Sequence, residues 1–178
     1  MRTLKKLGVI FALLYIMFPA TLSYSQGQQE AVGWLQMASK WRDVRTRLGD
    51  IRDDMLGAFE AEKSCNMLMV TDFIANVERI CRYEEQLFGA SAWMDAGNKA
   101  GYYDHRARLM KDAKQDVAIY LDGLRKERRH LKNNAALSVV DRAQSTIRSL
   151  LELFDQTIDY MKGESARLQR SNTNTEKP

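Results

Sequence analysis

Proline is absent from residues 26–177, and this absence constrains the fold more than any other feature of the sequence. The same segment holds only nine glycines. Proline removes a backbone donor and clashes with the preceding helical turn, so a chain without it contains few forced interruptions of a helix. We therefore expect long helices along almost the whole segment.

Apolar residues recur at alternating steps of three and four in three parts of this segment, as they do along the seam of a coiled coil. The first series is Trp34, Met37, Trp41, Val44, Leu48, Ile51 and Met55. The second is Met110, Ala113, Val117, Tyr120, Leu124 and Leu131; the third is Leu137, Val140, Ile147, Leu151, Phe154, Ile158 and Met161, with Gln144 as a polar member. We predict that these amphipathic helices pack around one core.

Residues 67–81 are apolar on most sides, which predicts a helix surrounded by others. The apolar spacing of the first series is lost at Glu62, and Ser64 is suited to cap a following helix, which favours a break at 62–66. The sequence then predicts an all-α fold, an antiparallel bundle of four helices with coiled-coil-like seams. Without the break the first two helices fuse, leaving three, and we would expect an elongated oligomeric coiled coil.

Other boundaries follow from local composition. We predict a helix end at Phe88-Gly89 and a loop over 89–101, which is rich in small and polar residues. A further break is expected at 133–134, after which Ser138 and Asp141 form a capping signature for the last helix. Residues 171–178 have no apolar surface to bury and are expected to form a disordered tail. The bundle is thus predicted to be a single domain, residues 26–170.

Residues 1–25 have the pattern of a secretory signal peptide. Three basic residues lie within the first six positions, residues 7–18 are apolar, and Ser23 and Ser25 are small. We expect cleavage before Gln26 and a periplasmic or otherwise extracytoplasmic mature protein. An uncleaved membrane anchor is the alternative, but the apolar run is shorter than the ~20 residues that span a bilayer. No later run predicts a transmembrane helix, although contact with a membrane surface stays open.

The charge of the mature chain argues against nucleic acid as a partner. The first 25 residues hold three of the 27 Lys and Arg, so 24 remain against 23 Asp and Glu, a formal charge of about +1. Most of the excess positive charge therefore belongs to the signal. We do not expect a nucleic-acid-binding protein.

Two cysteines and two histidines do not form a recognisable site. Cys65 and Cys81 lie about 24 Å apart if one helix holds both, which is too far for a disulfide. We expect two buried thiols that pack as small apolar groups, with a bridge through a hairpin or between subunits as the alternative. The spacing of His105 and His130 from the cysteines matches no usual zinc pattern, so no metal or cofactor is predicted.

The acidic cluster Asp50, Asp53 and Asp54 is the nearest approach to an acid/base pair. It is interleaved with Arg47 and Arg52, a pattern typical of a salt-bridged helix surface. No Ser/His/Asp, Cys/His or glycine-rich arrangement is present in the sequence. We predict a protein that is not an enzyme.

One basic run is a candidate surface for partner contact. We call it the basic patch: Arg125, Lys126, Arg128, Arg129 and Lys132. Cations near a helix C-terminus are ordinarily a solvated face that the helix dipole stabilises. The functional alternative is contact with an acidic protein, anionic lipid or translocating DNA.

The stretch Leu137-Ser138-Val139-Val140-Asp141-Arg142 opens the long final helix. Together with the signal and the proline-poor helical body, it resembles TrbJ-like helical periplasmic proteins of conjugative transfer and type IV secretion systems. The resemblance implies a component of the mating apparatus with no catalytic residues.

We therefore expect an exported, non-enzymatic protein that acts through protein contacts in the cell envelope, alone or as a homo-oligomer. The alternative is a periplasmic chaperone that holds unfolded envelope proteins, for which nine methionines would supply an adaptable surface.

Overall fold

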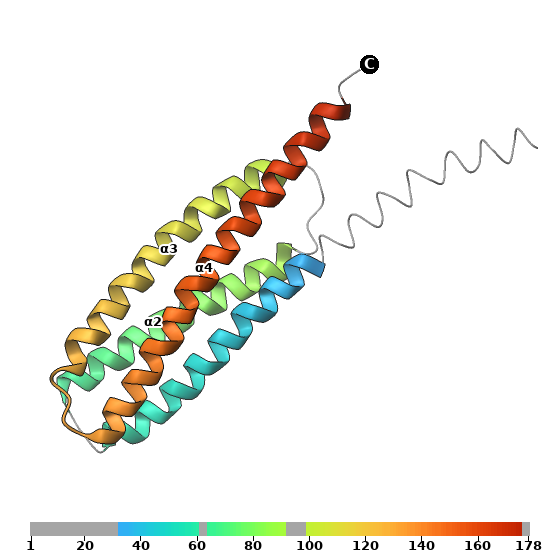
Figure 1. Ribbon diagram of the computed structural model, residues 1–178. Helices are drawn as coiled ribbons and strands as arrows, with labels where there is room; N and C mark the ends of the chain where they lie inside the picture. The colour runs from blue at the N-terminus through green and yellow to red at the C-terminus, as the bar shows by residue number, and fades with distance from the viewer. Residues whose placement is uncertain (1–31, 61–63, 92–98, 176–178) are drawn as a thin grey trace, which may run out of the picture.

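The computed structural model describes residues 32–60, 64–91 and 99–175. Four helices account for nearly all of them: a first helix over residues 32–60, α2 (Cys65–Ser91), α3 (Lys99–Arg128) and α4 (Asn134–Thr175). Consecutive helices run in opposite directions along an elongated bundle, and the 42-residue α4 extends beyond the others (Figure 1). The prediction of an all-α antiparallel bundle is confirmed.

The break between the first two helices is also confirmed. Ser64 lies outside the helix and caps α2, because its hydroxyl oxygen accepts a hydrogen bond of 3.3 Å from the backbone N–H of Met67. Its carbonyl oxygen accepts a second bond, of 3.3 Å, from the N–H of Leu68. The fused three-helix alternative is therefore wrong, although residues 61–63 themselves lie outside the described residues.

The three apolar series form the core as predicted. Every member of the first series is buried. In the second and third series, four residues are half-buried and pack against that core: Ala113, Tyr120, Leu137 and Leu151. Gln144 is buried as well, so the polar member of the third series faces inward rather than toward solvent.

An aromatic cluster joins all four helices around Trp34 of the first helix. The Trp34 ring lies 5.2 Å from Phe88 of α2, 5.1 Å from Tyr103 of α3 and 5.6 Å from Tyr160 of α4, measured between ring centroids. Its indole N–H donates a 3.1 Å hydrogen bond to the Tyr103 hydroxyl. Gly33 permits this approach, because a Cβ there would lie 2.5 Å from the Tyr160 hydroxyl.

One expectation about packing is wrong. Residues 67–81 are not surrounded by other helices, because Leu68 and Met69 are exposed. In an antiparallel four-helix bundle each helix has two close neighbours and one outer face, so α2 cannot be covered on all sides.

The start of α4 differs from the sequence prediction in its capping residue. The cap is Asn133, whose side-chain oxygen accepts hydrogen bonds from the N–H groups of Ala135 (2.8 Å) and Ala136 (3.3 Å). Ser138 lies inside α4 and is exposed. Asn133 is the cap because it directly precedes the first residue of α4, where the amide groups of the first turn still lack an acceptor.

Two further differences concern helix ends. α2 continues past Gly89 to Ser91, and α4 continues to Thr175, beyond the predicted start of the tail at Ser171. A lone glycine is tolerated near a helix end, and neither proline nor glycine occurs between Glu164 and Lys177 to stop α4. The predicted signal peptide and residues 176–178 lie outside the described residues.

Within the described ranges, none of the helices contains a segment that is both long and apolar enough to cross a membrane.

The position of the α4 cap at Asn133 predicts a difference in stability between two alanine variants. Replacing Asn133 by Ala should lower the free energy of unfolding by about 1 kcal/mol, because two N–H groups lose their acceptor. Ser138→Ala should leave it unchanged or raise it slightly, since alanine is the better residue inside a helix. Urea denaturation followed by circular dichroism measures both, and a loss in Ser138→Ala as large as that in Asn133→Ala would contradict the assignment of Asn133 as the cap.

Candidate functional site

Cross-helix ion pairs close the seam between the first helix and α2. Arg42 and Arg45 both bind Glu85, at 2.8 and 2.7 Å, and Arg52 binds Glu78 at 2.6 Å. Partial desolvation works against ionisation of Glu85, but the two arginines outweigh it and lower the pKa of that carboxyl. The charges that flank this seam are thus paired with each other.

The two seams of α4 are closed in the same way. Lys114 of α3 binds Asp155 at 2.6 Å. Arg128 binds both oxygens of Asp141, at 2.5 and 2.8 Å, and this contact lowers the pKa of the Asp141 carboxyl. Across the seam with the first helix, Arg142 binds Asp54 at 2.7 Å. Each of these exposed pairs stabilises the bundle little, but at least one crosses each seam of α4.

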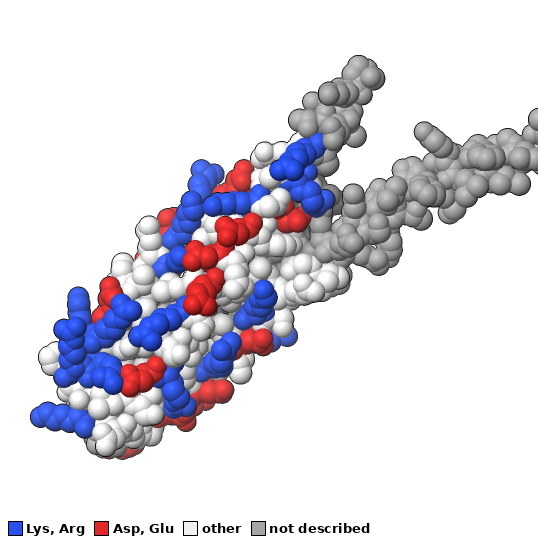
Figure 2. Space-filling view, viewed as in Figure 1, with Lys and Arg blue, Asp and Glu red and all other residues white. Residues whose placement is uncertain are grey.

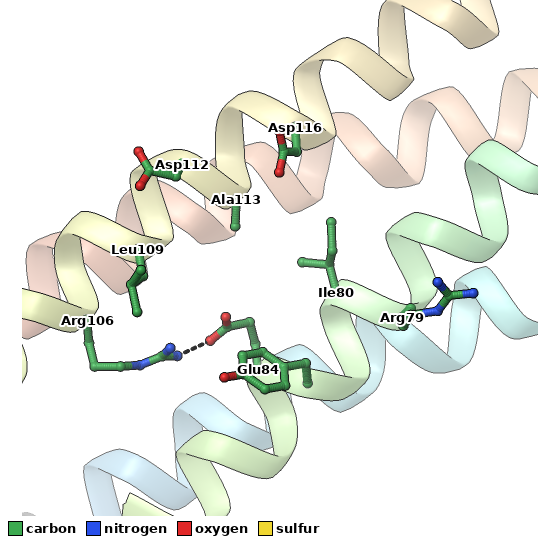
Figure 3. Close-up of a pocket in the computed structure, with 9 residues that line it drawn as sticks. Arg79, Ile80, Glu84, Arg106, Leu109, Asp112, Ala113 and Asp116 are labelled. Atoms are coloured by element: carbon green, nitrogen blue, oxygen red, sulfur yellow. Dashed lines mark hydrogen bonds and ion pairs between the residues drawn. The ribbon is translucent and has the colours of Figure 1, made fainter.

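A shallow groove of about 490 Å³ lies open along the seam between α2 and α3. We call this the α2–α3 groove, and its lining residues are Arg79, Ile80, Tyr83, Glu84, Arg106, Leu109, Asp112, Ala113 and Asp116. Figure 3 shows Arg106 reaching from α3 to Glu84 on α2, with Ile80, Leu109 and Ala113 in the space beside them.

The floor of the groove is a buried ion pair. The side chains of Arg106 and Glu84 are only 6 % and 5 % exposed, and a guanidinium N–H of Arg106 donates to the Glu84 carboxylate. Burial raises the pKa of Glu84 despite the neighbouring arginine. Arg106 Nε is buried and has no hydrogen-bond partner among the described residues. The pair is therefore incompletely satisfied, which makes it costly to desolvate further.

The groove is closed at both ends by side chains of the two helices. Toward the C-terminus of α2, the hydroxyls of Ser91 and Tyr102 are 3.0 Å apart. At the other end the rings of Phe73 and Tyr120 lie 5.9 Å apart, and Gly123 allows α3 to approach, since a Cβ there would lie 2.7 Å from the Phe73 ring. α2 and α3 therefore touch at both ends and part between them.

The walls of the groove are apolar and partly open to solvent. Tyr83 of α2 is 56 % exposed and Leu109 of α3 is 41 % exposed, while Ile80 is half-buried. Large apolar side chains that remain in contact with water along a groove are typical of a protein-contact surface.

The charges on the two rims are unpaired. Arg79 on α2 and both Asp112 and Asp116 on α3 are exposed, and none has an ion pair or side-chain hydrogen bond within the described part of the chain. Ion pairs cross each of the other three seams, although Asp50 and Arg47, beside the seam between the first helix and α4, form none within the described residues. The α2–α3 groove differs in combining unpaired rim charges with exposed apolar walls.

The basic patch lies at the end of the bundle where α3 ends. Figure 2 shows Lys and Arg side chains gathered there, beside the loop between α3 and α4. The structure brings its five residues to the same end, but Arg125 binds Asp122 at 2.7 Å and Arg128 binds Asp141. Lys126 and Arg129 project to solvent. Part of the positive charge of the basic patch is therefore paired within the chain, and less of it is available to a partner than the sequence suggests.

Two of the three carboxylates in the acidic cluster of the first helix are salt-bridged, as interpreted from the sequence. Asp53 binds Arg52 at 3.2 Å and Asp54 binds Arg142. Asp50 has no ion pair among the described residues. With Arg47 and Arg142 it lines a second shallow hollow, of about 290 Å³, at the seam between the first helix and α4.

The cysteines and histidines remain separate. Cys65 and Cys81 are both free and lie on the same helix, which excludes a bridge between them within the chain. Cys81 is buried as expected, but Cys65 is exposed, because it is the first residue of α2 at the end of the bundle. His105 and His130 are exposed, and no metal-binding group of three or more ligands occurs among the described residues.

The sequence contains a signal for the α2–α3 groove that the sequence prediction misses. A second series at steps of four and three runs along α2, with Asn76 as its polar member: Met69, Phe73, Ile80, Tyr83 and Leu87. It lies beside the buried series of the same helix, which is Met67, Val70, Ile74, Val77 and Cys81. The two series together make a broad apolar surface on α2. In the sequence such a surface looks the same as that of a helix enclosed on all sides, which is why the groove is not predicted.

Comparison with protein-family models, with curated proteins and with solved structures gave no match to this chain.

Cysteine labelling should separate the two thiols. Burial, reinforced by Glu78 and Glu84, raises the pKa of Cys81 to about 12, so almost no reactive thiolate exists at pH 8. We expect the folded protein to react rapidly at Cys65 alone, and Cys81 to react only after denaturation. Mass spectrometry of the labelled Cys65→Ser variant checks this, and rapid labelling of that variant while folded would contradict the buried position of Cys81.

Removing one partner of the buried ion pair should lower the free energy of unfolding far more than removing both. Arg106→Met leaves the Glu84 carboxylate buried alone, and we expect a loss of about 3 kcal/mol in the free energy of unfolding at pH 7. The double variant Arg106→Met/Glu84→Leu should recover most of that loss.

The stability that Arg106→Met loses, measured as free energy of unfolding, should also become smaller at acid pH. The raised pKa of Glu84 means that the folded protein holds this proton more tightly than the unfolded chain. Its stabilising effect is therefore present at low pH and is lost as the pH rises through the folded pKa. Urea denaturation between pH 4 and pH 7, relative to the unmodified protein, measures this, and a deficit that grows in acid would contradict it.

Proposed function

We propose that this protein is a non-enzymatic helical docking protein that binds another protein through the α2–α3 groove. The observation that carries the proposal is the α2–α3 groove, which has exposed apolar walls and rim charges that no described residue pairs. An apolar centre with a polar rim is the usual anatomy of a protein interface. A partner would cover Tyr83 and Leu109 and pair the rim charges.

We further propose that it works in the cell envelope, as a component of a conjugative transfer or type IV secretion apparatus. The signal pattern of residues 1–25, the nearly neutral mature chain and the resemblance of residues 137–142 to TrbJ-like proteins support this placement. The basic patch offers a second contact surface for acidic partners. Lys126 and Arg129 are among its exposed cations.

A general holding chaperone is less well supported. Six methionines lie in the described residues, and five of them are buried: Met37, Met55, Met67, Met110 and Met161. Only Met69 is exposed among the six. Flexible, promiscuous surfaces depend on accessible methionine side chains, so this chain retains little of such a surface. A defined partner is favoured.

Photo-crosslinking in cells that naturally make the protein tests the proposal. A photoreactive amino acid in place of Tyr83 should give discrete adducts with a small set of envelope proteins, because the groove wall lies against the partner. The matched control places the same amino acid at Ser149, an exposed position on α4.

The pattern of adducts separates the functions. One defined partner captured from position 83 and not from 149 is the expected result, and a pilus or secretion-channel subunit would place the protein in the transfer apparatus. A broad mixture of envelope proteins would favour the chaperone, and identical patterns from both positions would contradict docking through the α2–α3 groove.

A further inference from the structure

We propose that a second copy of this chain covers the α2–α3 groove, so that the protein is a homodimer with this groove at its interface. The inference rests on the proposed function, that the groove docks a protein, and it names that protein. Its basis is the distribution of charge on the two rims.

The rims carry opposite charges. Arg79 stands on the α2 side, and Asp112 and Asp116 stand on the α3 side (Figure 3). All three line the same groove, so they lie at a similar height along the bundle. A surface with a cation on one rim and anions on the other is complementary to itself, as a two-fold symmetric interface requires.

The charges also select the direction of the symmetry axis. A two-fold axis parallel to the helices places α2 of one copy opposite α3 of the other at the same height. Each Arg79 then faces the Asp112 and Asp116 pair of the other copy, and the contact occurs twice. An axis across the helices would instead place α2 on α2 and bring the two Arg79 side chains toward each other, which like-charge repulsion disfavours.

Exposed apolar side chains lie on the same face, where the proposed two-fold arrangement would bury them. Tyr83 and Leu109 lie at the centre of the proposed interface, and a partly exposed tyrosine is a common anchor of such contacts. Met69 (46 % exposed) lies fourteen residues before Tyr83, and Ile119 (67 % exposed) lies seven after Asp112. These spacings keep each on the same side of its helix. Met69 of one copy would meet the Ile119 region of the other.

The size of this face suits a dimer. α2 has 27 residues and α3 has 30, so each is about 40 to 45 Å long. Two adjacent helices at the usual spacing present a face about 20 Å wide. The resulting area, roughly 800 Å², equals what each partner buries in a standard protein interface.

Charge exchange tests the arrangement. The chain, expressed from the full 178-residue sequence and purified, should sediment as a dimer at micromolar concentration. Arg79→Asp should raise the dimer dissociation constant by roughly tenfold or more, since each interface loses two attractive contacts and gains repulsion. The triple variant Arg79→Asp/Asp112→Arg/Asp116→Arg restores complementarity with the signs reversed, and should restore the dimer.

Two further variants distinguish loss of the dimer from misfolding and test whether a different face of the bundle forms the interface. Tyr83→Glu should give a monomer with an unchanged helical circular dichroism spectrum. Leu35→Glu places the same charge at an exposed leucine on the first helix and should remain a dimer. A monomeric unmodified protein at about 100 µM, well above the micromolar affinity of a typical standard-size interface, or a dimer that neither Arg79→Asp nor Tyr83→Glu weakens, would overturn the inference.

Failure of this inference is distinguishable from failure of the proposed function. A monomer that still crosslinks an envelope protein from position 83 refutes the dimer and leaves docking intact. A monomer with no adducts specific to position 83 refutes both. A dimer that depends on Arg79 and crosslinks only to itself from position 83 supports both the dimer and docking through the groove. Membership of a larger apparatus then depends on a surface outside the groove, such as the basic patch.

Discussion

The aromatic contacts of Trp34 are the interaction on which the bundle most depends, because this ring meets a ring from each of the other three helices. Phe88, Tyr103 and Tyr160 surround it, and its N–H is satisfied by the Tyr103 hydroxyl. Aromatic packing of this kind fixes the lateral order of four helices whose apolar series alone would allow several arrangements. Once that order is set, α2 and α3 are neighbours, and the α2–α3 groove exists between them.

The groove follows from the shape of the side chains on these two helices. Small or interlocking groups allow close approach at its ends, where Gly123 accepts Phe73 and Ser91 meets Tyr102. Between them the Arg106–Glu84 pair occupies the floor, and the helices cannot close over it without stranding more polar atoms. The proposed binding surface thus lies over a buried ion pair whose Arg106 Nε has no hydrogen-bond partner among the described residues. The proposed dimer would use the same opening without rearranging the bundle.

Much of the fold is predictable from residue spacing, whereas the site is not. The series beginning at Trp34 identifies core positions because helical periodicity reports which side of a helix is apolar. It does not report which neighbour covers that side, so the spacing within residues 67–81 wrongly predicts a fully enclosed helix. The basic patch follows from composition, but pairing of Arg128 with Asp141 depends on the loop that brings α4 beside α3. The choice of Asn133 as the cap depends on where that loop ends.

By itself the sequence determined that the chain is helical, that its helices are long and antiparallel, and that Cys65 and Cys81 cannot pair within one helix. Those properties follow from local rules: the absence of proline, the spacing of apolar residues and the rise of a helix. Only the tertiary structure decided which charges are paired. Arg79, Asp112 and Asp116 look like any other charged residues in the sequence, and they differ only because neighbouring helices, within the described ranges, supply no partner across the α2–α3 groove. Pairing is a property of distances between helices, which no local pattern records.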